Sequence, residues 1–322
     1  MSYTNYMKIQ PSPHPLQKIA ISASLAASAL MLGGKLTAYY MTHSSAILSD
    51  AVESVVHVFA TGVAAASLWY ASKPADENHL YGHGKVAYFS AGFEGGIILF
   101  ASLGIIFNAV ENLITRQPLQ NLGMGLGIIA VLAVVNLLLG MFLLYSGRKT
   151  HSLVLVSNGQ HVLTDMWTSI GVILGVGLVR LTGYIWLDGV VAILIGLHIL
   201  TSGYKLMRKS WKGLLDEADP LITKILLECL ENAVKEGDIV GFHQLRHRET
   251  ENIMWVETHV TLPDSMTNRE AHDIATRLEQ TVYGRFPDIF VQMTTHIEPA
   301  SHDQVHPKGH EDLVAPHDVS PK

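Results

Sequence analysis

Six long apolar runs constrain this chain more than any other feature of its sequence. A helix needs about 20 mostly apolar residues to cross the hydrocarbon core of a bilayer, and each run reaches that length. The runs therefore predict a bundle of six transmembrane helices, within a membrane domain at residues 16–211. The predicted helices are Leu16–Met41, Ser44–Tyr70, Val86–Leu113, Leu122–Tyr145, Ser152–Leu181 and Tyr184–Leu206.

Charged residues are scarce and unevenly placed. They make up 16% of the chain, against about 25% in a typical soluble protein, and they gather after Lys212. A membrane half followed by a soluble half explains this distribution. The net charge of -6 and the absence of an arginine-rich run argue against nucleic acid as a partner. The single cysteine excludes a disulfide framework and a thiolate metal cluster.

The segment 212–300 has the pattern of a small α+β domain. Two stretches have helical periodicity, and three alternate as strands. Their order, helix, two strands, helix, strand, predicts a ferredoxin-like αββαβ fold. The predicted elements cover residues 219–237, 241–250, 253–262, 268–286 and 289–299.

The loops and the chain ends carry the information on orientation. Lysine and arginine lie mainly before the first helix, in the loops after the second and fourth helices, and after the sixth. By the positive-inside rule, both termini face the cytoplasm. Residues 1–15 are read as a cytoplasmic segment, and residues 301–322, with four histidines and three prolines, as a disordered tail. We expect an integral protein of the bacterial inner membrane.

Ionisable residues inside the apolar runs are the first candidates for function. Glu53 and His57 lie four residues apart in the second run, and His161 and Asp165 are spaced likewise in the fifth. Residues at this spacing share one face of a helix, and intramembrane ionisable groups often mark an ion pathway. Two imidazoles and two carboxylates suit a tetrahedral Zn²⁺, and Cd²⁺, Fe²⁺ or Mn²⁺ less exclusively. A buried polar cluster that only joins the two helices is the alternative.

Several stretches of the chain resemble the cation diffusion facilitator family. They are "SSAILSDAVESVVHVFA", "KPADENHLYGHGK", "HVLTDMWTSIGVILG", "LTGYIWLDGVVAILIG" and, near the end, "GFHQLRH", "ETHVTLPD" and "THIEP". The resemblance implies a homodimeric antiporter that exports divalent cations from the cytoplasm in exchange for protons. It also implies that residues 16–211 form the transport domain and residues 212–300 a cytoplasmic metal-binding and dimerisation domain.

The resemblance also implies particular metal ligands. His161 and Asp165 match the usual pair on the fifth helix, whereas Glu53 and His57 exchange the order of acid and imidazole seen on the second. Zn²⁺ is the expected substrate and also a regulatory ligand. Matching positions imply a peripheral site in the second loop and a regulatory site in the soluble domain. These positions are Asp76, His79 and His83 in the loop, and His243, His259, His272, His296 and Glu298 in the domain.

Alternatives from other functional classes remain open. The main ion could be Fe²⁺, Mn²⁺, Cd²⁺ or Co²⁺, or the protein could be a membrane-anchored metal sensor without transport activity. An intramembrane metalloenzyme would need an open coordination position and a general base, for which Glu94 is the clearest spare carboxylate. No G-x-x-x-x-G-K-[ST] motif points to a nucleotide-driven pump. We therefore expect a transporter and not an enzyme.

Overall fold

The structure, a computed structural model, describes residues 14–42, 45–115, 123–184, 186–250, 253–287 and 289–301. The predicted N-terminal segment and the histidine-containing tail lie almost wholly outside these residues. The chain divides into two compact units, Met1–Leu214 and Leu215–Lys322.

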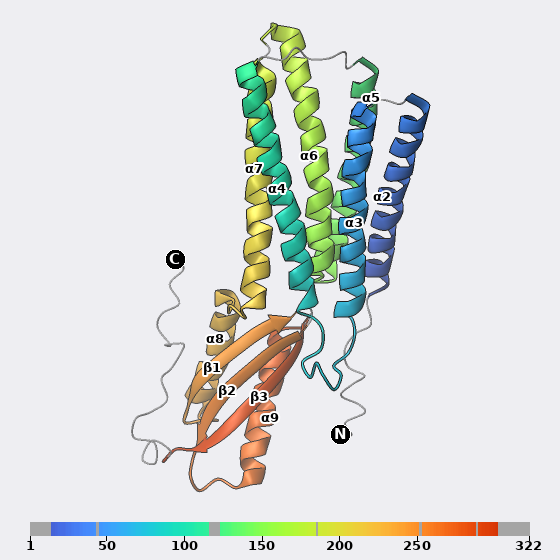
Figure 1. Ribbon diagram of the computed structural model, residues 1–322. Helices are drawn as coiled ribbons and strands as arrows, with labels where there is room; N and C mark the ends of the chain where they lie inside the picture. The colour runs from blue at the N-terminus through green and yellow to red at the C-terminus, as the bar shows by residue number, and fades with distance from the viewer. Residues whose placement is uncertain are drawn as a thin grey trace. The chain divides into compact units, whose positions relative to one another are not determined.

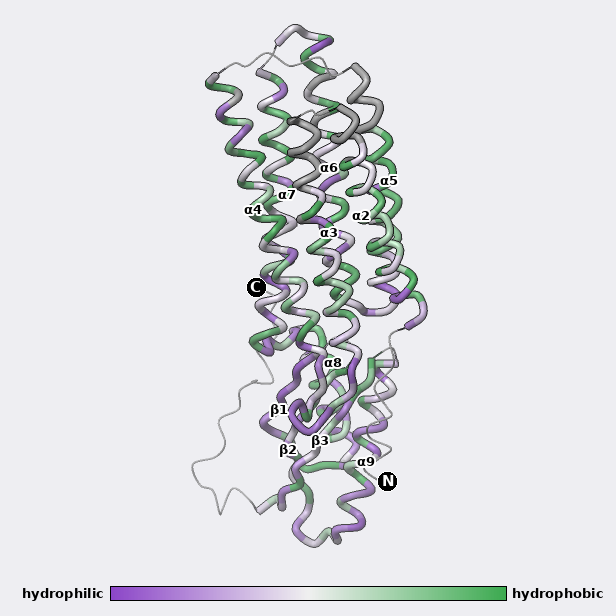
Figure 2. Tube along the Cα trace, turned by 45° about the vertical axis from the view of Figure 1, so that its right-hand side comes forward, coloured by the Kyte–Doolittle hydropathy of each residue, from purple (hydrophilic) through white to green (hydrophobic). Residues whose placement is uncertain are grey.

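The first unit is a bundle of six long helices, and the second is an α+β domain, so the predicted fold class is confirmed (Figure 1). Among the described residues, five of the helices are long and apolar enough to cross a membrane, and α3 is the sixth long helix of the bundle. Figure 2 shows hydrophobic residues dominating these helices. The helices are α2 (Pro15–Thr42), α3 (Ser45–Ala71), α4 (Val86–Thr115), α5 (Gly123–Lys149), α6 (Leu153–Thr182) and α7 (Trp186–Leu214).

Glycines bring α4 and α7 into close contact along their length (Figure 1). A Cβ atom on Gly196 would lie 2.6 Å from Cγ1 of Ile106, and one on Gly95 would lie 3.0 Å from the backbone nitrogen of Met207. The first separation is shorter than real Cβ contacts, and the second is tighter than most of them. Small residues at such contacts let two helix backbones approach closely in a membrane protein, so α4 and α7 pack as a tight pair.

A second close pair is formed by α5 and α6. A Cβ on Gly140 of α5 would lie 2.7 Å from Leu163, and one on Gly159 of α6 would lie 3.1 Å from the Leu143 side chain. This contact holds the first half of α6, where His161 lies, against α5.

The second unit is a three-stranded sheet with two helices. Strands β1 and β2 pair antiparallel, and β2 and β3 pair parallel, in the order β1-β2-β3. Asp219 caps the first helix by accepting from Leu221 N–H, and Thr267 and Glu270 form a capping box on the second. The elements are α8 (Pro220–Glu236), β1 (Gly241–Thr250), β2 (Ile253–Leu262), α9 (Asn268–Arg285) and β3 (Phe290–Pro299).

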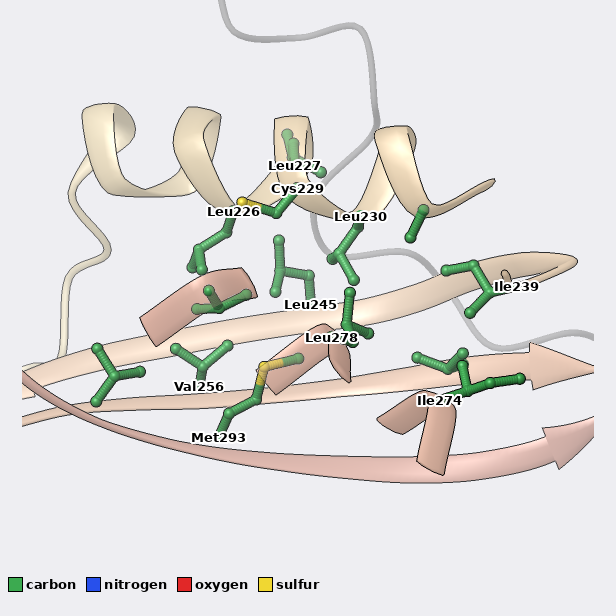
Figure 3. Close-up of a cluster of buried hydrophobic side chains, with 14 of the residues drawn as sticks. Leu226, Leu227, Cys229, Leu230, Ile239, Leu245, Val256, Ile274, Leu278 and Met293 are labelled. Carbon is green, nitrogen blue, oxygen red and sulfur yellow. The ribbon is translucent and has the colours of Figure 1, made fainter. Parts of the chain in front are cut away.

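The core of this unit lies between the helices and one face of the sheet. In Figure 3, Leu226 and Leu230 of α8 point toward Leu245 and Val256 of the strands. Burial alternates along β2, where Val256 and Val260 are buried. Side chains of successive strand residues point to opposite faces, so Glu257 and His259 lie on the face that the helices leave open.

Candidate metal sites

Two helices of the bundle bring three predicted ligands together. Nδ1 of His57 on α3 lies 2.9 Å from Nε2 of His161 on α6, and 3.5 Å from Oδ2 of Asp165. Two nitrogen ligands of one tetrahedral Zn²⁺ lie about 3.3 Å apart, given Zn–N bonds of about 2.0–2.1 Å. A shift of a few tenths of an ångström would therefore let both imidazoles bind one ion.

The helical spacing explains why these residues meet. His161 and Asp165 are four residues apart on α6, so they share the face that α6 presents to α3. Glu53 lies on α3 one turn before His57, and its side chain is outside the described residues. Its place as a fourth ligand stays a prediction.

The three ligands line a cavity of about 260 Å³. Residues of four helices line it, because α2 and α5 contribute in addition to α3 and α6. A cavity beside the ligands gives a partly hydrated ion room to bind. The polar residues of its wall are Ser28, Ser54, His57, Thr61, Asn136, His161, Asp165, Thr168 and Ser169.

Glu94 belongs to a different polar cluster of the bundle. It is fully buried on α4, and its Oε1 accepts a hydrogen bond of 3.4 Å from Nδ2 of Asn158 on α6. Oδ1 of Asn158 in turn accepts from the hydroxyl of Ser24 on α2, at 2.7 Å. Glu94 is not among the residues that line the cavity, so this structure gives it no position from which to act as a general base on an ion bound there.

The loop between α3 and α4 forms a second group of possible ligands. Nδ1 of His79 lies 3.1 Å from Oδ1 of Asp76, and Nε2 of His83 lies 3.4 Å from Oδ2 of the same carboxylate. The two imidazole rings are 4.4 Å apart. All three predicted loop ligands therefore converge, and their ligand atoms lie within 4.8 Å of one another.

Backbone hydrogen bonds hold this loop in shape. The N–H groups of His79 and Asn78 donate to Oδ1 of Asp76, at 2.7 Å and 2.9 Å. The bond from the His79 N–H is the main cause that holds the pKa of Asp76 below its usual value. The carboxylate is thus kept ionised, as metal binding requires. His83 is buried and packs edge-on against Tyr70.

In the second unit, strand register aligns three histidines. His259 of β2 pairs with His243 of β1 on one side and with His296 of β3 on the other. Residues directly opposite one another on neighbouring strands share a face. These three therefore lie on the open face of the sheet, and Glu298, two residues after His296, lies there too.

Glu298 joins the histidines into one cluster. Its Oε1 is 2.9 Å from Nδ1 of His259, and its Oε2 is 3.2 Å from Nε2 of His243. His296 is more peripheral, with Nε2 at 3.5 Å from Oε1 of Glu298 and 63% of its side chain exposed. A carboxylate with histidines around it is a donor set that suits Zn²⁺.

Two residues of the soluble domain do not join this cluster. His272 is exposed on α9, and it is not among the described histidines in contact with Glu298. Gln244 lies at an irregularity in β1, with φ of 51°, and its Oε1 accepts from Arg246. Within one chain the cluster therefore contains four of the five predicted ligands.

Comparison with known proteins identifies the family. Residues 21–215 match the cation efflux transmembrane domain, and residues 224–300 match the cytoplasmic domain of cation efflux proteins. The chain belongs to the cation diffusion facilitator family. It is a divalent-cation efflux transporter by family, which agrees with the expectation that it is not an enzyme.

Relatives of the cation diffusion facilitator family match over nearly the whole chain. An uncharacterised transporter of Synechocystis sp. is 34% identical over 88% of this chain and 90% of its own. The cation-efflux pump FieF of Salmonella paratyphi A is 28% identical over 89% of this chain and 93% of its own. A solved structure of CzrB in its zinc form covers 27% of this chain and 93% of its own, with 23% identity and a TM-score of 0.25.

Proposed function

We propose that this family member exports Zn²⁺, in exchange for protons, through a site made by Glu53, His57, His161 and Asp165. The observation that carries the proposal is the convergence of His57 and His161 beside Asp165, at the wall of a cavity inside the bundle. Two neutral imidazoles and ionised carboxylates bind a divalent ion, and their protonated forms do not.

Competition between the metal and protons for the same ligands couples metal export to the proton gradient. When the site faces the cytoplasm near neutral pH, it loads the metal. When it faces a more acidic exterior, protons displace the metal and the ion leaves. The proton gradient thus drives export without a nucleotide. In this arrangement the protein lies in the inner membrane with both termini in the cytoplasm, and Fe²⁺, Mn²⁺, Cd²⁺ and Co²⁺ compete for the same ligands.

The two other metal groups fit supporting roles in a homodimer. The group of Asp76, His79 and His83 would capture metal at the cytoplasmic mouth of the bundle. The cluster around Glu298 lies on a sheet face that its own helices leave uncovered, so a second copy of the domain could contact it there. In such a dimer His272 would complete the partner's site, and bound Zn²⁺ would stabilise the pair.

Reconstitution into liposomes tests the proposal. Purified protein in proteoliposomes with an imposed pH gradient should accumulate Zn²⁺ in the more acidic compartment. Addition of Fe²⁺, Mn²⁺, Cd²⁺ or Co²⁺ should reduce this Zn²⁺ uptake by competition. Collapse of the gradient with a protonophore should stop this accumulation. A metal sensor without transport activity would bind Zn²⁺ and yet show no flux above that of empty liposomes.

A further inference from the structure

Helix α5 contributes a polar residue to a cavity whose predicted ligands come from α3 and α6. Asn136 lines this cavity together with His57, His161 and Asp165. It is the only side chain with a hydrogen-bonding group in residues 130–144, AVLAVVNLLLGMFLL. A membrane-spanning helix does not require an amide at this position, because the run would span the membrane equally well with leucine there.

The amide of Asn136 points inward and not toward lipid. Only 8% of the residue is exposed. Ala133 and Gly140, one turn before it and after it, are buried as well, whereas Val135 and Leu138 lie on the exposed side of the helix. The residue therefore belongs to the face that α5 turns to its neighbours, and its burial needs a polar partner.

The protein itself does not supply that partner among the described residues. There the Asn136 side chain has no hydrogen bond, whereas other polar groups of the same cavity are bonded. The hydroxyls of Ser28 and Thr61 lie 3.3 Å apart, and that of Thr168 donates to the Asp165 carbonyl at 2.8 Å. An amide that lines a cavity, and that has no hydrogen-bond partner among the described residues, is available to whatever occupies the cavity.

We infer that Asn136 sets the ion preference of the transport site, by offering its side-chain carbonyl oxygen to the bound cation, directly or through one water. The inference rests on the proposed function, because it requires the ion to bind beside His57, His161 and Asp165. A neutral oxygen added to two nitrogens and two carboxylates raises the coordination number above four. That change favours Mn²⁺ and Co²⁺ relative to Zn²⁺, which accepts a closed tetrahedral set.

Substitution of Asn136 in the full-length protein tests the inference. Asn136→Leu keeps the branched shape of the side chain, although leucine is larger, and removes the oxygen. We therefore expect the KM for Mn²⁺ and Co²⁺ uptake into proteoliposomes to rise about tenfold more than the KM for Zn²⁺. Asn136→Asp keeps an oxygen at the same place and adds charge, so it should bring the KM for Mn²⁺, relative to that for Zn²⁺, back toward the wild-type ratio. Leu138→Ala, on the lipid side of the same helix, should leave the ratios unchanged. Size-exclusion chromatography checks folding, and Asn136→Ala replaces the leucine variant if that one aggregates.

The outcomes separate this inference from the proposed function. If Asn136→Leu and Asn136→Ala both keep all KM ratios within about twofold of the wild type while Asp165→Ala carries no ion, the inference fails and the transport site stands. If Asp165→Ala carries Zn²⁺ normally, the proposed site is wrong, and the assignment of Asn136 falls with it. A selective loss of Mn²⁺ and Co²⁺ transport in Asn136→Leu, reversed by aspartate, supports the assignment.

Discussion

Nδ1 of His57 lies 2.9 Å from Nε2 of His161, although 104 positions separate the two residues in sequence. Two imidazoles at this distance share one hydrogen bond, in which one nitrogen donates and the other accepts. An ion that binds between them must replace that hydrogen bond. Without metal, the same bond keeps the two imidazoles close to the arrangement that metal binding requires.

Loss of Asp165 should abolish transport. Asp165→Ala removes a ligand and a negative charge from the site, and the remaining donors bind a divalent ion too weakly to carry it. We expect Zn²⁺ flux at the level of empty liposomes, with a normal elution volume for the purified protein. Thr182→Ala, at the exposed end of the same helix, serves as the control and should transport normally. Wild-type flux in Asp165→Ala would remove this residue from the site.

Exchange of the acid and the imidazole on α3 tests the composition of the ligand set. The double variant Glu53→His with His57→Asp keeps two nitrogens and two carboxylates, so it should still carry Zn²⁺. Glu53→His alone gives three nitrogens and should disfavour Mn²⁺, whereas His57→Asp alone gives three carboxylates and should favour it. The ion preference is measured as Zn²⁺ and Mn²⁺ flux under one pH gradient, for the wild type, the two single variants and the double variant. An ion preference that stays constant in all of them would show that α3 supplies no ligand.

Zinc should stabilise the soluble unit through the histidine row on its sheet. At a Zn²⁺ concentration about 100 times the Kd, binding adds about 2.7 kcal/mol to the free energy of unfolding, which raises Tm by roughly 10 °C or more in a domain of this size. His259→Ala should remove most of this rise, because it deletes the central ligand. Asn232→Ala on α8, on the helix side of the sheet, should keep it. Equal melting temperatures with and without Zn²⁺ in the unmutated fragment 215–301 would exclude the site.

Acid should destabilise the soluble unit through His247. Burial lowers the pKa of this imidazole, and the nearby Asp219 carboxylate offsets the effect in part. Since the unfolded chain binds a proton at an ordinary pKa of about 6.5 and the folded domain binds it less readily, stability is present above that pH and is lost as the pH falls below it. Nε2 of His247 lies 2.8 Å from the Thr223 hydroxyl, a bond that glutamine can replace. Urea unfolding, measured from about pH 8 to about pH 5, gives the free energy of unfolding at each pH. This free energy should fall less steeply with acid in His247→Gln than in the unmutated protein, and equal slopes for the two proteins would contradict the assignment.

Gly95 lies where α4 packs closely against the backbone of α7, so this position should tolerate no large side chain. Gly95→Leu would push against the backbone of Met207, which cannot move aside, and overpacking of this kind costs about 1–3 kcal/mol. Gly104, on the same helix, has nothing within 4 Å of the position that a Cβ would take, so Gly104→Leu is the matched control. Thermal stability in detergent compares the two variants. The packing argument fails if Gly95→Leu melts at the same temperature as Gly104→Leu.

Hydropathy predicted the helices of the bundle closely, but not all of their ends. The sixth helix was expected to end at Leu206, and α7 continues to Leu214. The last turns contain several basic residues, which end an apolar run without ending a helix. Helix formation depends on backbone hydrogen bonds and propensity, whereas the apolar run reports only the part that contacts lipid. In the soluble unit, caps and turn residues placed each predicted element within two residues of its observed bounds.

The candidate ligand pairs on each helix could be proposed from spacing, whereas contacts between elements could not. The sequence does not show that His243, His259 and His296 are aligned in one row, because register depends on the turn between β1 and β2 and on the crossover through α9. The part that we propose above for Asn136 was not predicted either. A single amide within an apolar run was the available signal, but the face on which it lies became clear only from the packing of α5.

The close contact of α4 with α7 limits how the bundle can change shape. Side chains such as Ile106 occupy hollows above glycines of the facing helix, so these two helices cannot slide past each other without first moving apart. They should therefore move together as one rigid body during any rearrangement. In the transport cycle that we propose, the surfaces that move would then be those around the cavity, where α2 and α3 face α5 and α6. A crosslink between α4 and α7 should therefore leave transport intact.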